Sequence, residues 1–86
     1  MALYSMLVEH EGESFSTQFD GSTVEDAVRA FLAHSLARST SPPLGPQDII
    51  YITPMTDLVN IWAVCAGKNG RYVNITVART EAQQGE

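Results

Sequence analysis

The sequence predicts an α+β fold: a two-layer sandwich in the order β-β-α-β-β-β, with one helix on one face of a five-stranded, mainly antiparallel sheet. Three observations lead to this prediction. Residues 22–38 have helical periodicity, and the apolar stretches on either side have the length and composition of strands. In addition, Asn69-Gly70 is a strong signal for a two-residue hairpin.

The predicted helix has a single apolar stripe. Ser22, with Glu25 three residues later, fits a capping box at its start, and Arg38 before a polar and proline-rich run is expected to end it. Glu25 and Arg29 are spaced to pair across one turn. Phe31 lies in the middle of the stripe and is expected at the centre of the core. The stripe consists of Val24, Ala27, Val28, Phe31, Leu32 and Ser35.

Two strands are expected before the helix. Residues 2–10 are apolar on both faces, whereas residues 14–19 alternate between a polar and an apolar face. Residues 11–13 form the turn between them. Asp20 and Gly21 are expected to form the bend that leads into the helix.

Three strands are expected after the helix. Residues 48–53 are β-branched and aromatic, and Pro54 ends that strand. Residues 58–66 then pair with the segment after Arg71 around Asn69-Gly70. A tight turn pairs Ala66 with Val73, Val64 with Ile75 and Trp62 with Val77 under the helix, and Cys65 with Asn74, Ala63 with Thr76 and Ile61 with Ala78 on the other face.

The chain is expected to form one domain over residues 1–79, followed by a disordered tail over residues 80–86. Residues 39–47, which contain three prolines, are interpreted as a connector. No internal repeat is visible. The crossover from the second strand to the third leaves the strand order open.

The composition argues against several functions. Ten acidic and five basic residues give a formal net charge of −5, and the basic residues do not cluster, so direct nucleic-acid binding is disfavoured. No apolar run is long enough to cross a membrane, and the single Cys65 cannot form an internal disulfide. A cytoplasmic location is therefore expected.

No catalytic, metal or cofactor site is predicted. Glu9, His10, Glu11 and Glu13 could surround a divalent metal, but such a cluster is more often a solvated turn and lacks a specific ligand spacing. Cys65 with His34 or His10 would be the one available thiol–imidazole pair, and a buried inert thiol is the preferred interpretation. The glycines are scattered singly, so no phosphate-binding loop is present.

The leading hypothesis is a small acidic cytosolic interaction module that is not an enzyme. It would self-associate and regulate or inhibit a larger basic partner, as a bacterial or phage accessory protein does. A symmetric homodimer is expected through the sheet face opposite the helix, with strand-edge pairing as the less favoured geometry. The predicted interface residues are Val59, Ile61, Ala63, Cys65, Tyr72, Asn74, Thr76 and Ala78.

The alternative hypothesis is a small-molecule-binding protein or a minor enzyme. It would use a pocket between helix and sheet, with His34 or His10 at its rim.

Residues 13–30, a strand followed by GSTVEDAV, resemble the start of the HicB-type antitoxins, in which a hairpin precedes a helix that opens with a Thr-x-Glu-x-Ala pattern. That family usually carries a Pro-x-Leu-Pro-Gly type turn before the helix, which is absent here. In size, acidity and lack of motifs the chain is also similar to small phage proteins that inhibit bacterial defence complexes. Neither resemblance places the chain in a family.

Overall fold

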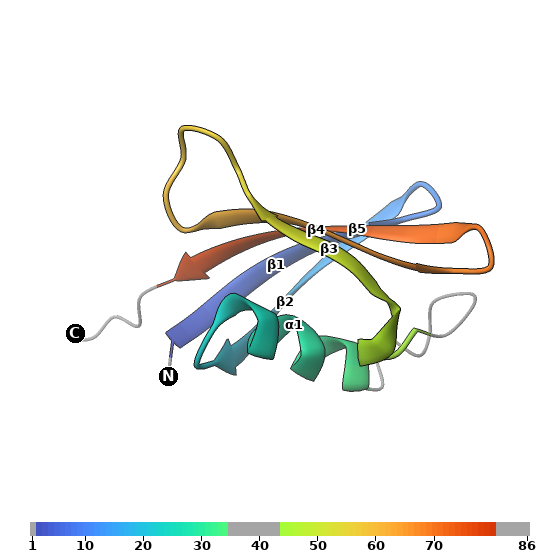
Figure 1. The fold of residues 1–86 in the computed structure, drawn as a ribbon, viewed down its shortest axis with the longest axis horizontal. Coiled ribbons are helices and arrows are strands. Elements are labelled where there is room, and N and C mark those ends of the chain that lie inside the picture. Colours follow the sequence, from blue (N-terminus) through green and yellow to red (C-terminus); the bar gives the residue numbers. More distant parts are fainter. Residues whose placement is uncertain (1, 35–43, 81–86) are drawn as a thin grey trace.

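The computed structural model describes residues 2–34 and 44–80, and it confirms the predicted fold (Figure 1). Five strands form one sheet, and one α-helix covers one of its faces. The elements in chain order are β1 (Ala2–His10), β2 (Glu13–Gly21), α1 (Val24–Ala33), the 3-10 turn η2 (Pro46–Asp48), β3 (Ile49–Pro54), β4 (Ile61–Lys68) and β5 (Arg71–Thr80).

The strand order is β2-β1-β5-β4-β3, and all neighbouring strands are antiparallel. The first hairpin therefore joins the last three strands through the pairing of β1 with β5, and β5 is the central strand of the sheet. The edge strands are β2 and β3. This order settles the question that the sequence left open.

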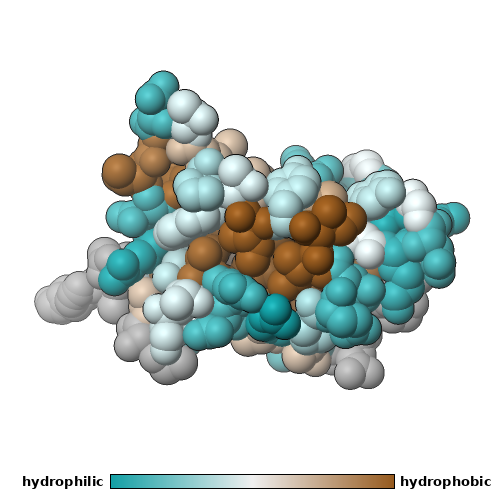
Figure 2. Space-filling model, viewed as in Figure 1, coloured by the Kyte–Doolittle hydropathy of each residue, from teal (hydrophilic) through white to brown (hydrophobic). Residues whose placement is uncertain are grey.

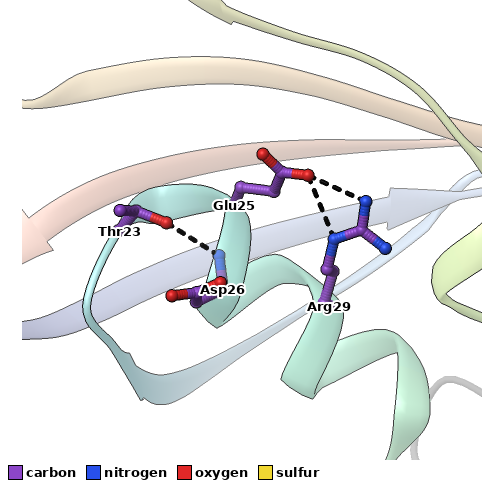
Figure 3. Close-up of polar contacts among 4 residues, drawn as sticks. All are labelled: Thr23, Glu25, Asp26 and Arg29. Carbon is purple, nitrogen blue, oxygen red and sulfur yellow. Dashed lines mark hydrogen bonds and ion pairs between the residues drawn. The ribbon is translucent and has the colours of Figure 1, made fainter.

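The N-cap of α1 is Thr23, so the prediction of Ser22 was wrong by one residue. Thr23 has an extended backbone, and its hydroxyl accepts a hydrogen bond from the Asp26 N–H at 3.1 Å (Figure 3). The predicted capping box therefore does not form, because it required Ser22 at the cap. The predicted pair on the helix surface does form, since Arg29 donates to the Glu25 carboxylate at 2.8 Å.

The last residue of α1 is Ala33, so the predicted end near Arg38 was wrong. His34 already has an extended backbone, and its N–H bonds to the Phe31 carbonyl, which closes a tight last turn. The His34 ring also lies edge-on to Phe19, 5.4 Å between centroids, where helix and sheet meet. Residues 35–38 lie outside the described part of the chain.

The apolar stripe of α1 packs on the sheet as predicted, with Ala27, Val28, Phe31 and Leu32 all buried. Phe31 is 1% exposed and lies at the centre of the core. Leu44, which the sequence placed in a connector, is also buried in this core. The strands contribute Tyr4, Met6, Val8, Val64, Ala66, Val73, Ile75 and Val77.

The end of β2 lies very close to the start of α1. Gly21 is the last residue of β2 rather than part of a separate bend, and a Cβ atom there would lie 2.6 Å from the Ala27 backbone nitrogen. Glycine is therefore required at this position because the helix backbone occupies the space of a side chain.

The β4–β5 hairpin confirms the predicted register at all six pairs. Asn69 and Gly70 both have positive φ, as a type I′ turn requires. β4 begins at Ile61 rather than at residue 58, because Asp57 and Asn60 adopt positive φ and interrupt the extended chain. Val59 therefore lies in the β3–β4 loop and not on the sheet.

A β-bulge at Ile50 changes the phase of β3. Ile49 pairs with Ala66 and Ile52 with Val64, so both isoleucines are on the helix side although they are three positions apart in the sequence. Tyr51 and Thr53 consequently lie on the opposite face.

β5 continues through Thr80, which pairs with Leu3 and shares a hydrogen bond of 2.7 Å with the Ser5 hydroxyl. Thr80 therefore belongs to the sheet, and the rest of the expected tail, residues 81–86, lies outside the described residues. Within residues 2–34 and 44–80, no helix has the length and apolarity needed to span a membrane.

Candidate functional site

The sheet face opposite α1 is the main candidate site, and we call it the open face. Strand alternation assigns to it the odd-numbered residues of β1 and β4, the even-numbered residues of β2 and β5, and Tyr51 and Thr53 of β3. α1 lies on the other side of the sheet (Figure 1). No described element covers the open face.

The charged residues of the open face are all acidic. Its strand positions include Glu9 and Asp20, both exposed, and no lysine or arginine. The basic residues of the strands, Lys68, Arg71 and Arg79, occupy positions on the helix side of the sheet. The remaining described arginine is on α1. The open face therefore carries acidic but no basic strand residues.

Large apolar side chains are exposed among these polar positions. Leu7 is 42% exposed, Tyr51 48% and Tyr72 55%. The Tyr72 ring lies over Gly67, its partner across the hairpin, where a Cβ atom would come within 2.4 Å of the ring. Because Gly67 has no Cβ atom, the Tyr72 ring can pack against the sheet at this position.

A shallow open hollow of about 540 Å³ crosses the open face over β2, β1 and β5. On its floor the Gln18 side-chain amide donates to the Ser5 hydroxyl at 2.9 Å, and this hydroxyl is hydrogen-bonded to Thr80. Its lining combines hydroxyls and an amide with Leu7 and Ala78. Such a surface suits a partner that presents both polar and apolar groups.

Seven of the eight predicted interface residues occupy strand positions of the open face: Ile61, Ala63, Cys65, Tyr72, Asn74, Thr76 and Ala78. Val59 does not, since it lies in the β3–β4 loop and is 82% exposed. The interface prediction omitted Leu7 and Tyr51. The position of Leu7 follows from the alternation of its strand, whereas that of Tyr51 depends on the bulge and carries no clear sequence signal.

A second apolar region lies along β3 and the loop after it. Five large apolar side chains between residues 50 and 59 are exposed: Ile50, Tyr51, Met55, Leu58 and Val59. Figure 2 shows hydrophobic surface along β3 and toward α1. The β3–β4 loop rises from the sheet on the side away from the helix (Figure 1). This region therefore borders the open face at one edge of the sheet.

Cys65 is buried, as the preferred interpretation of an inert thiol requires. Burial also raises the pKa of the Cys65 thiol by desolvation, so the neutral form is favoured. Cys65 occupies the open face, whereas His10 and His34 are on the helix side, where His34 contacts Phe19. The sheet thus separates the thiol from both imidazoles.

The acidic cluster at the first hairpin is divided by strand alternation. Glu9 is on the open face, while His10 and Glu13 occupy positions on the helix side. Glu11, at the turn, accepts a hydrogen bond from Arg71. Among the described residues, no three His, Cys, Asp or Glu side chains come together as a possible metal site.

The space between helix and sheet, where the alternative hypothesis placed a pocket, is occupied by core side chains. Met6, Phe31 and Leu32 fill it at 1% exposure each. The hollow over β2, β1 and β5 lies on the opposite side of the sheet from that space.

Searches with protein-family models, against curated proteins and against solved structures gave no significant match to this chain. The resemblance of residues 13–30 to the HicB-type antitoxins therefore gains no support from them.

Proposed function

We propose that this protein is a small, non-enzymatic interaction module that forms a homodimer and regulates a larger protein by binding a basic surface of it. The open face would be the binding site for that partner. The cytoplasm is the proposed location, where the single thiol stays reduced.

The distribution of charge on the open face supports this proposal most directly. Glu9 and Asp20 are its only charged strand residues, and the whole chain carries a formal net charge of −5. Two carboxylates at opposite ends of this face, with no cation among its strand positions, attract a lysine- or arginine-rich surface and raise the rate of encounter. The same two charges disfavour a second acidic surface, including another copy of this face.

The other side chains of the open face favour a protein rather than an ion as the partner of this face. Tyr51 and Tyr72 are half exposed on this face, and tyrosine is enriched where proteins bind one another. Leu7 adds apolar area near the Ser5–Gln18–Thr80 hydrogen bonds. The face thus combines aromatic anchors with groups that can form directional hydrogen bonds.

A charge-reversal capture experiment tests the proposal. Tagged wild-type protein is purified from native lysate beside Glu9→Lys/Asp20→Lys, and retained proteins are identified by mass spectrometry. We expect the wild type to retain a protein with a basic surface, moderate salt to release it, and the open-face variant to lose it. The control Glu13→Lys/Glu25→Lys makes the same change in net charge away from the open face.

Retention of that protein by the control variant would support the open face as its site. Equal loss from both variants would mean that net charge alone is recognised. Equal retention by both would exclude the open face. Circular dichroism of each variant checks that the fold is intact.

A further inference from the structure

The outer edge of β3 has no neighbouring strand among the described residues. β3 is last in the order β2-β1-β5-β4-β3, and its backbone on that side lacks a partner from the sheet. Exposed strand edges of this kind are templates for pairing with another strand, and natural proteins usually protect them with charges, bulges or short length.

The backbone groups that face outward can be assigned. The Met55 N–H donates to the Ile61 carbonyl at 3.0 Å, so Met55 faces β4. In an antiparallel ladder the backbone N–H and C=O groups of successive residues point alternately to the two sides of the strand. The backbone groups of Thr53 and Tyr51 therefore also point toward β4. The N–H and C=O of Ile52 point to the free edge. The C=O of Pro54 also points to the free edge. Because Pro54 faces outward, its missing N–H removes no hydrogen bond to β4.

No charged side chain protects this edge, and the bulge at Ile50 and the six-residue length of β3 confine any pairing to the segment around Ile52. Residues 49–56, IIYITPMT, contain no lysine, arginine, aspartate or glutamate. Ile50 and Tyr51 are about half exposed. The other edge strand differs, because β2 carries Glu13 and Asp20 near its two ends and has exposed Ser14, Ser16 and Gln18 between them.

We infer that β3 pairs with β3 of a second copy, antiparallel about a two-fold axis at Ile52, to form one continuous ten-stranded sheet. Each Ile52 N–H donates to the Ile52 carbonyl of the other copy. Ile50 of each copy lies beside Pro54 of the other. The contact is isologous, so it closes as a dimer rather than growing into a filament.

The lack of charge on this edge favours a second copy of this acidic chain as the occupant. Two acidic chains repel each other, but an uncharged strand lets them meet without opposing carboxylates. Pairing through the open face would instead bury a surface whose charged strand residues, Glu9 and Asp20, are both acidic and have no basic strand residue of that face to pair with. Edge pairing leaves both open faces on one side of the joined sheet, free for a basic partner. The inference deepens the self-association in the proposed function and rests on it.

Sedimentation of matched variants tests this geometry, with wild type, Ile52→Pro, Ile50→Lys and Ser16→Lys compared at tens of micromolar. Ile52→Pro removes the outward N–H and should weaken the dimer roughly tenfold or more. Ile50→Lys adds a charge to the edge at an exposed side chain, and we expect mainly monomer. Ser16→Lys adds the same charge to the open face on β2, at the other edge strand, and should leave the dimer intact.

Residue-resolved amide exchange adds a readout without mutation. The Ile52 amide should exchange more slowly as protein concentration rises, while amides of β2 should not change. A dimer that survives Ile50→Lys but is lost in Ser16→Lys would overturn edge pairing in favour of the open face. A monomeric wild type would overturn self-association altogether, whereas the charge-reversal capture would still decide whether a basic partner is bound.

Discussion

Phe31 of α1 and Phe19 of β2 lie edge to face, with their ring centroids 5.9 Å apart and their planes at 67°. Phe15 of the same strand approaches Phe31 from a second position, 6.2 Å between centroids. These contacts fix the rotation of the helix on the sheet. Because one helix provides this entire layer, the sheet's other face has no such cover among the described residues.

Truncation of Phe31 should therefore unfold much of the population. Phe31→Ala removes a ring that is 1% exposed, at an expected loss of about 3 to 5 kcal/mol in the free energy of unfolding. Chemical denaturation measures this loss, with Arg29→Ala as a control on the exposed side of the same helix. A melting temperature within a few degrees of wild type would mean that the ring is not central to the core.

The helix cap makes a prediction about two adjacent residues. Thr23→Ala should cost about 1 kcal/mol, because it removes the hydroxyl that accepts from the Asp26 N–H. Ser22→Ala should change the stability much less, since Ser22 is exposed and precedes the cap. Thermal unfolding of both variants compares them directly. A larger loss from Ser22→Ala would restore the cap that the sequence suggested.

Cys65 should react slowly while the protein is folded. The thiol is buried, and its raised pKa leaves less thiolate than a free cysteine has at the same pH. A chromogenic disulfide reagent at pH 8 should modify the native protein far more slowly than protein unfolded in guanidinium. Similar rates in both states would show an accessible thiol on the open face.

Much of the fold could be predicted because local signals agreed with one another. The stripe around Phe31 defined the buried side of the helix, and Asn69-Gly70 set the register of β4 and β5 residue by residue. The errors occurred at element ends. The helix begins after Thr23 because its hydroxyl caps the first turn, and it ends before His34 because the backbone there is already extended. Side-chain periodicity contains no information about either feature.

The candidate site was harder to predict because it depends on contacts between distant strands. The bulge at Ile50 puts Tyr51 on the open face, and positive φ at Asn60 separates Val59 from β4. To predict that the charged strand residues of the open face are acidic, one must know which strand positions lie on the same side of the sheet. The strand order was also needed to recognise β3 as an edge, and the sequence alone left that order open.

The mass of the wild-type protein in solution tests the central claim most directly. Light scattering behind size exclusion, at tens of micromolar, should give twice the 9.4 kDa of one chain. The mass should fall toward one chain on dilution, as expected for a short edge contact. A constant mass of 9.4 kDa over the same range would contradict self-association and leave β3 without the proposed partner.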